Sequence, residues 1–287
     1  MTAPAATIAP PAAGTAAPFT RVAHVLDDTL AIVGRNLLRI VRAPDQMMFT
    51  LFAPIMFTLL FRYVFSGAIA GLHGVNYTNY LIPGVAAQTA MFASGASGFG
   101  LAEDRQKGFT DRLRSLPMSR TAVITGRVIS DAVANSAGLL IIVLVGVAVG
   151  FRPHSIIGLI LGLAVLLAFT MATSFMFALV GQYASNAQAV NAITFPLIMP
   201  LTFASSAFVS PATMPSWLRA FANHQPVSVV IYALRDLTLG NVTAAQRHFL
   251  FAGESTTSLV VQSLLWAAGI GVIFCFLAVR KFNSTTS

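Results

Sequence analysis

Six apolar segments, separated by polar or charged stretches, follow one another along this 287-residue chain. Each is long enough to cross a hydrocarbon core of about 30 Å, which requires about 20 helical residues. We place them at residues 47–65, 80–101, 128–149, 156–180, 192–209 and 259–279. The pattern predicts an all-helical integral membrane protein with six spans.

Several polar or helix-breaking positions within these spans carry further predictions. Arg62 falls near the end of the first span, so its side chain has to reach the membrane interface. Pro196 and Pro200 lie inside the fifth span and predict a kink or local unwinding. Glycines spaced by four residues predict close helix contacts within one subunit. They are Gly146 with Gly150 and Gly158 with Gly162.

The chain before the first span divides into two parts. Residues 2–18 contain Ala, Pro, Thr, Gly and one Ile, so residues 1–18 are predicted to form a disordered tail. In residues 19–43, apolar side chains recur at three- and four-residue steps, with arginines along the rest of the surface. This pattern predicts a cytoplasmic amphipathic helix in the membrane interface. Residues 44–282 then contain all six spans.

Composition supports a membrane protein and excludes several other classes. Hydrophobic residues make up 56% of the chain and charged residues 9%, whereas a soluble domain has about 25% charged residues. A lone cysteine, Cys275, and scattered histidines predict neither a disulfide nor a metal site. Neither lysine follows a phosphate-binding glycine loop, so ATP is expected on another chain. Membrane topology explains the excess of basic residues, so no nucleic-acid partner is predicted.

Basic residues predict the orientation. Four lie in the N-terminal flank, six in the loop after the second span and two at the C-terminus. These twelve of the seventeen basic residues therefore fall on one side when the N-terminus is cytoplasmic. The positive-inside rule then places both termini in the cytoplasm.

The cytoplasmic loop at residues 103–127 has the pattern of a short helix. Glu103 and Asp104 open it, which suits a helix N-terminus, and basic residues follow later. Pro117 ends the helix. One apolar stripe consists of Phe109, Leu113 and Leu116. Such a helix could dock in a groove of a cytoplasmic partner, and a solvated loop that merely fixes topology explains the spacing equally well.

The long segment at residues 210–258 is predicted to lie on the external side. Apolar residues at helical spacing indicate two short amphipathic helices in the outer interface, the first beginning near Trp217. The helices should break at Gln225-Pro226, and the second should stop at Gly240.

Two stretches resemble a known family. The run EDRQKGFTDRLRSLPMSR, directly after the second span, resembles the cytoplasmic loop of type-2 ABC exporter permeases. The run MPSWLRAFANHQPVSVVIYALRDLTLG is similar to the segment before the last span in the daunorubicin/doxorubicin-resistance branch. The order of elements matches over residues 20 to 282, nearly the whole chain.

This resemblance implies a transport subunit that is not itself an enzyme. Two permeases, identical or related, would pair in a bacterial plasma membrane above two ATPase subunits, which would bind ATP and magnesium. This chain would bind no cofactor and would export a hydrophobic or amphipathic drug-like compound or lipid. The ATPase-coupling residues would be Glu103, Asp104, Arg105, Lys107, Gly108, Phe109, Arg112, Leu113, Arg114, Leu116 and Pro117. The external cap would include Trp217, His224, Gln225, Pro226 and Arg235.

Asp131 supports an alternative function. This acid lies just inside the cytoplasmic end of the third span, and an acid at membrane depth indicates a proton or cation site. The chain would then be an ion-coupled secondary transporter. Arg127, four residues earlier, could instead pair with Asp131 at the interface, and we favour that pairing.

Overall fold

A computed structural model describes residues 33–34, 44–65, 76–109, 120–240 and 242–284, and every regular element within them is helical. The first half comprises α2 (Pro44–Leu60), the π-helical turn η1 (Phe61–Phe65), α3 (Tyr77–Gln106), α5 (Arg120–Ala148) and α6 (Ile156–Tyr183). The second comprises α7 (Ala187–Phe203), the short 3-10 turn η2 (Pro211–Thr213), α8 (Ser216–His224), α9 (Pro226–Leu239), α10 (Ala244–Phe251) and α11 (Thr256–Ser284). The predicted tail and nearly all of the predicted amphipathic helix lie outside the described residues.

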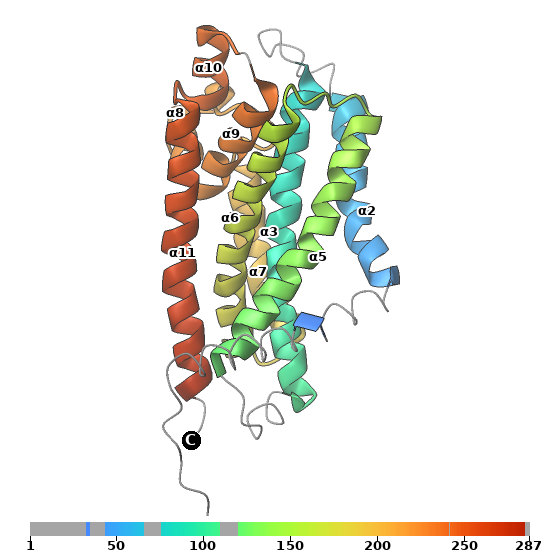
Figure 1. The fold of residues 1–287 in the computed structure, drawn as a ribbon, viewed down its shortest axis with the longest axis vertical. Helices are drawn as coiled ribbons and strands as arrows, with labels where there is room; N and C mark the ends of the chain where they lie inside the picture. The colour runs from blue at the N-terminus through green and yellow to red at the C-terminus, as the bar shows by residue number, and fades with distance from the viewer. Residues whose placement is uncertain (1–32, 35–43, 66–75, 110–119, 241, 285–287) are drawn as a thin grey trace, which may run out of the picture.

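The long helices run side by side along the longest axis of the molecule (Figure 1). α6 packs against both α3 and α11, and α3 also contacts α5 and α7. α8 and α10 lie at the end of the bundle opposite to the C-terminus. Each of the six predicted apolar segments coincides with one helix: α2, α3, α5, α6, α7 or α11.

Three described stretches are long and apolar enough to cross a membrane: Val123–Ala148, Ile156–Tyr183 and Ala244–Phe282, the last of which contains α11. Leu51–Val64 and Ala187–Phe203 are shorter apolar helices. α3 has 30 residues, about 45 Å of helix, but it is less apolar. Most of α3 is buried among the other helices, so its many small and hydroxyl-bearing residues face protein.

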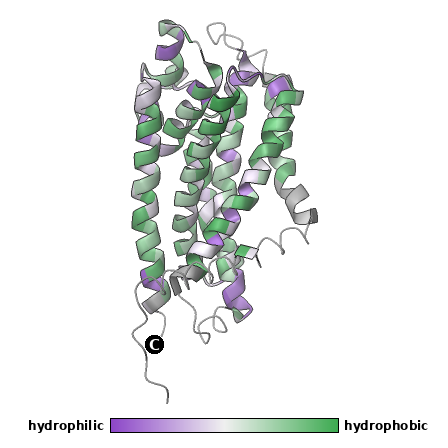
Figure 2. Cartoon of the chain, viewed as in Figure 1, coloured by the Kyte–Doolittle hydropathy of each residue, from purple (hydrophilic) through white to green (hydrophobic). Residues whose placement is uncertain are grey.

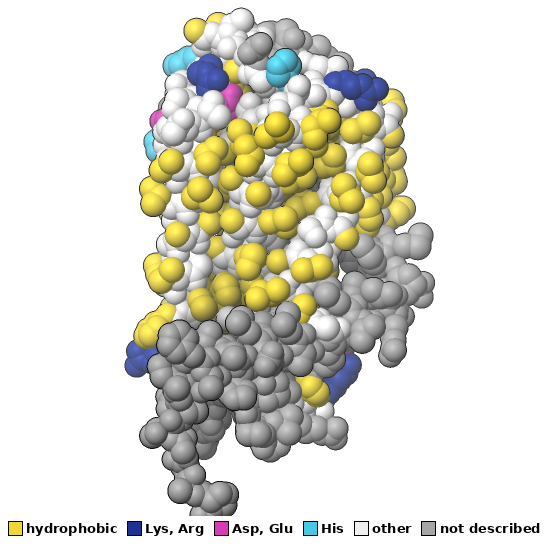
Figure 3. All heavy atoms as spheres, in the orientation of Figure 1, with side chains coloured by type: hydrophobic (Ala, Val, Ile, Leu, Met, Phe, Trp, Pro, Cys, Tyr) yellow, Lys and Arg dark blue, Asp and Glu magenta, His cyan; other side chains and the backbone are white. Residues whose placement is uncertain are grey.

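The outer surface of the bundle is apolar over most of its length. Hydrophobic residues dominate the middle of the helices, and hydrophilic residues gather at the two ends (Figure 2). On the face shown in Figure 3, apolar side chains form a broad band between basic side chains at either end. Large exposed side chains include Ile156, Ile157, Leu265, Val272 and Phe276. This surface suits a hydrocarbon environment, because lipid tails solvate apolar side chains that water would not.

Glycines allow the central helices to touch closely. A side chain at Gly158 would overlap the Leu237 carbonyl, and one at Gly162 would overlap Leu234. These contacts confirm that this glycine pair packs helices within the subunit, here α6 against α9. In the other pair, a Cβ at Gly146 on α5 would lie 3.0 Å from the Ile82 side chain of α3, whereas Gly150, with a φ of +105°, follows the end of α5 and a Cβ there would meet no atom within 4 Å.

The helix at the fifth predicted span begins and ends earlier in the chain than residues 192–209, at Ala187 and Phe203. α7 ends at Phe203, and residues 204–210 continue as turns of which Ser205 and Ser206 are fully buried. Pro196 and Pro200 both lie within continuous helix, so the structure shows no local unwinding at either, and the kink predicted as the other outcome stays a prediction. The helix instead ends one turn after Pro200, whose carbonyl accepts the Ala204 N–H at 2.8 Å.

The external segment folds partly as predicted. α8 ends at His224, α9 begins at Pro226, and Gly240 caps α9 with a φ of +71°, a conformation that favours glycine. The prediction that both helices lie in the outer interface is wrong for α9. Nearly all of α9 is buried against α3, α6 and α11, because its apolar residues surround the whole helix and not one stripe.

Candidate functional site

The segment predicted to couple to an ATPase begins at the C-terminal end of α3. Glu103, Asp104 and Arg105 belong to the last turn of this helix. The Lys107 N–H donates to the Glu103 carbonyl at 3.0 Å, and Gly108, with a φ of +66°, ends the turn. The prediction that the two acids open a new helix is therefore wrong: α3 continues past its apolar part and carries them at its end.

The central part of the predicted coupling loop lies outside the described residues. Phe109 is the last residue described before it, and α5 begins at Arg120. The positions concerned are Arg112, Leu113, Arg114, Leu116 and Pro117. Their docking role stays a prediction.

Glu103 and Lys107 form a surface pair at the end of α3. The Lys107 ammonium lies 2.7 Å from Glu103 Oε1, and the Lys107 side chain is 63% exposed. Glu103 is half-buried, at 23% exposure, and an i,i+4 pair with one exposed partner contributes little to stability.

Arg105 points into the bundle. Its guanidinium donates to the Gln182 carbonyl at 2.7 Å and to the Ala184 carbonyl, both at the C-terminal end of α6. A positive charge at a helix C-terminus is favourable, because it meets carbonyls that the helix leaves unpaired. Arg105 therefore fastens α3 to α6 beneath the predicted coupling segment.

Arg127 lies between two acids from different helices. Its Nε is 3.1 Å from Asp131 Oδ2 within α5, and its Nη1 is 3.6 Å from Asp104 Oδ2 on α3. The Ser97 hydroxyl donates to Asp131 Oδ2 at 2.5 Å. The expected pairing of Arg127 with Asp131 is confirmed, and the Asp131 carboxylate is held by a cation and a hydroxyl.

The residues predicted to cap the external end occupy different environments. Trp217 is 73% exposed on α8, as an outer position requires. His224 ends α8, with its Nδ1 2.8 Å from the Ala220 carbonyl. Gln225 is buried and donates to the Leu201 carbonyl at the end of α7. Pro226 is the first residue of α9, where its missing N–H costs no helical hydrogen bond.

Arg235 lies in the interior, so its predicted place on an external cap is wrong. It is fully buried, and its guanidinium carbon lies 3.6 Å from the centre of the Tyr80 ring. Nη2 donates to the Tyr80 carbonyl at 3.0 Å and to the Ser206 carbonyl at 2.9 Å. Arg235 thereby joins α9 to α3 and to the non-helical segment after α7, because these backbone groups need a donor away from water.

An ion pair between half-buried Arg247 and buried Asp236 joins α9 and α10, and a hydroxyl of α11 also binds this acid. Asp236 on α9 binds Arg247 on α10 through two contacts of 3.0 and 3.1 Å, and it accepts the Thr256 hydroxyl at 2.6 Å. α10 was not among the helices predicted from the sequence. The spacing of Thr243 and Gln246, which form a complete capping box, is the signal that predicts its start.

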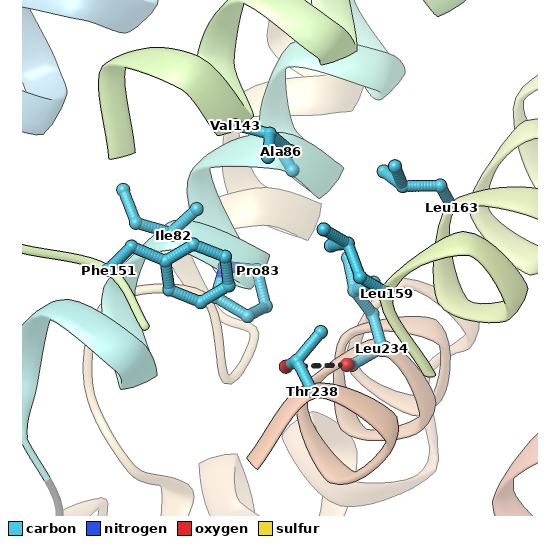
Figure 4. A pocket seen from close by; sticks show the side chains of 9 residues that line it. All are labelled: Ile82, Pro83, Ala86, Val143, Phe151, Leu159, Leu163, Leu234 and Thr238. Atoms are coloured by element: carbon cyan, nitrogen blue, oxygen red, sulfur yellow. Dashed lines mark hydrogen bonds between the residues drawn. The ribbon is translucent and has the colours of Figure 1, made fainter. Parts of the chain in front are cut away.

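A small pocket lies where α3, α5, α6 and α9 meet. Figure 4 shows its lining: Ile82, Pro83, Ala86, Val143, Phe151, Leu159, Leu163, Leu234 and Thr238. None of these lining side chains carries a charge. The Thr238 hydroxyl donates to the Leu234 carbonyl at 2.9 Å. No cluster of three or more potential metal ligands occurs among the described residues.

The apolar helical bundle with charged ends defines a multi-pass membrane protein. The family model of the ABC-2 type transporter matches residues 27–239, and the chain belongs to this family. It is a membrane subunit of an ABC exporter, and ATP hydrolysis takes place on a separate ATP-binding subunit.

Curated relatives share most of the chain. A daunorubicin resistance ABC transporter permease, DrrB1 of Streptomyces coeruleorubidus, is 30% identical over 91% of this chain and 88% of its own length. The doxorubicin resistance permease DrrB of Mycobacterium tuberculosis is 27% identical over 84% of this chain and 81% of its own. A putative transport permease, ycf38 of Porphyra purpurea, is 28% identical over 74% of each chain.

Proposed function

We propose that this protein exports a hydrophobic or amphipathic compound, drug-like or lipid, out of the cytoplasm or the inner leaflet. Relatives named for daunorubicin and doxorubicin resistance support the drug-like class. The wide apolar surface supports a cargo that partitions into the bilayer, because such a cargo can reach the protein from the lipid.

Six crossings of a bacterial plasma membrane, with both termini in the cytoplasm, complete this proposal. Six helices coincide with the predicted spans, and α3 at about 45 Å exceeds the thickness of the hydrocarbon core. The C-terminal ends of α3 and α11 lie at the same end of the bundle, together with the start of α5 (Figure 1). That end carries the basic loop, as the positive-inside rule requires of a cytoplasmic end.

The ATPase subunit is proposed to dock on residues 103–120. The observation that carries this proposal is the continuation of α3 beyond its apolar part, which brings the half-buried Glu103 and the exposed Lys107 beside the loop. Two copies of the permease, or this chain with a related one, would pair above two ATPases. ATP and magnesium would bind to the ATPases.

An ion-coupled transporter that uses Asp131 is the weaker alternative. A carrier acid has to be free to bind and release its ion, whereas Asp131 is buried and held by Arg127 and Ser97. ATP-independent transport that collapses with the proton gradient would favour the alternative.

Charge reversal of the loop tests ATPase docking. In the double variant R112E/R114E, we expect the dissociation constant for the ATPase to rise at least tenfold, because each reversal removes a cation of the proposed docking surface and puts an acid in its place. Export into inverted vesicles should fall in parallel, with doxorubicin and NBD-labelled phosphatidylethanolamine as probes of the two cargo classes. R280E is the matched control, because Arg280 is exposed at the end of α11 that we assign to the cytoplasm.

Binding and export at wild-type levels in R112E/R114E would overturn the docking proposal. A comparison of the two probes separates drug export from lipid export, and neither probe accumulating with ATP would contradict both cargo classes.

A further inference from the structure

The cytoplasmic ends of α3 and α5 are joined through one arginine. Arg127 contacts a carboxylate on each helix, Asp104 and Asp131, and its Nη2 also donates to the Ala96 carbonyl of α3 at 3.4 Å. The side chains of Arg127, Asp104 and Asp131 are 14%, 14% and 8% exposed. A cation shared by two largely buried carboxylates forms stronger contacts than an exposed pair, because water screens it less.

α3 provides a gap for this arginine. Gly100 has no side chain, and a Cβ at that position would overlap the Arg127 guanidinium. The guanidinium therefore lies directly against the α3 backbone, one turn before Asp104. Arg127, its two acids and the glycine form one arrangement, which we name the α3–α5 clasp.

The clasp lies at the base of the predicted coupling loop. α3 leads into residues 107–119 and α5 follows them, so the clasp joins the helices that bear both ends of the loop. Arg105 extends the connection to α6, and Gln182 at the end of α6 donates to the Ala278 carbonyl of α11 at 3.1 Å. A force on the loop therefore meets a continuous set of polar contacts across α3, α5, α6 and α11.

We propose that Arg127 is a positioning residue for energy coupling. It holds α3 and α5 together so that a displacement of the loop moves both helices as one body. Without the clasp, the loop would still bind the ATPase, but its movement would be lost as relative motion of the two helices. This inference rests on the proposed docking of an ATPase on residues 103–120. It also assigns different roles to the two neighbouring acids: Asp104 belongs to the clasp, and Glu103 belongs to the proposed docking surface.

Three variants perturb the clasp by different means. R127Q removes the cation, D104N removes the α3 charge at constant volume, and G100A displaces the guanidinium without changing any charge. G138A is the control for the glycine change, because a Cβ at Gly138 on α5 would make only an ordinary contact, 3.6 Å from Leu51.

The complex with its ATPase is purified and reconstituted for each variant, and three quantities are measured: the dissociation constant of the ATPase, the rate of ATP hydrolysis and the doxorubicin exported per ATP. NBD-labelled phosphatidylethanolamine replaces doxorubicin where the wild type exports only the lipid. In R127Q we expect export per ATP to fall about tenfold, within the range of coupling between two sites. ATPase binding should stay within about twofold of wild type, whereas the melting temperature should fall, because R127Q leaves two largely buried carboxylates without their cation. G100A and D104N should show the same loss to a smaller extent, and G138A none.

Wild-type export per ATP in R127Q and G100A would overturn the proposal, as would loss of ATPase binding in either. Where R127Q is not obtained as a folded protein, G100A and D104N decide by the same readout. Intact ATPase binding in R112E/R114E would instead reject the docking proposal, so the two failures are distinguishable.

Discussion

Replacement of Gly98 by alanine is expected to prevent stable packing of α3 against α6. A Cβ at Gly98 would overlap the Phe177 carbonyl, and at the same crossing a Cβ on Gly181 would overlap the Gly98 carbonyl. Both obstacles are backbone atoms, so no side chain can rotate to make room. We expect a loss of about 3 kcal/mol or more in the free energy of unfolding. The measurement is the melting temperature and monodispersity of the detergent-purified protein.

G269A is the matched control for this prediction. Gly269 is exposed on α11, and a Cβ there would meet no atom within 4 Å. The same substitution should leave stability unchanged or raise it by up to about 1 kcal/mol, because alanine favours the helix more than glycine does. Equal behaviour of the two variants would show that α3 and α6 are not in backbone contact at Gly98.

Removal of the Arg235 side chain is expected to be similarly severe. R235A would leave the carbonyls of Tyr80 and Ser206 without the guanidinium donor and would open a cavity beside the Tyr80 ring. The Ser206 carbonyl keeps the Tyr80 hydroxyl as a donor, so the cost comes from the lost guanidinium hydrogen bonds and from the cavity, together about 3 kcal/mol or more. R235K should restore only part of the lost stability, because a compact ammonium cannot stack on the Tyr80 ring and also reach two carbonyls. The melting temperatures of the purified proteins should decrease in the order wild type, R235K, R235A.

R219A is the control for R235A. Arg219 on α8 also donates to backbone carbonyls, those of Pro211, Ala212 and Met214, but its side chain is exposed and water can replace it. We expect little change in melting temperature. An R235A protein as stable as R219A would contradict the interior role of Arg235.

Local signals predicted a large part of the fold. The break at Gln225-Pro226 and the stop at Gly240 were predictable, because proline suits the first turn of a helix and glycine accepts a positive φ. The pairing of Arg127 with Asp131 follows from their spacing on one helix. α10 was also within reach, through the capping box that Thr243 and Gln246 form.

Contacts between distant segments could not be predicted in this way. In the sequence, Arg105 is one of several basic residues in a basic loop. In the structure, its side chain donates to the Gln182 carbonyl at the end of α6. Asp104 and Glu103 are adjacent acids, yet they face Arg127 and Lys107 respectively, because successive side chains on a helix point about 100° apart.

The sequence by itself determined the class of the protein, the positions of the six apolar segments and the ends of the external helices, since run length, charge distribution, proline and glycine act locally. Tertiary structure decided which polar side chains face the interior. Arg235 and Tyr80 are 155 positions apart, and only the packing of α9 against α3 brings them together. Burial depends on all neighbours of a residue at once, so Arg235, which the family resemblance placed in an external cap, lies instead in the core.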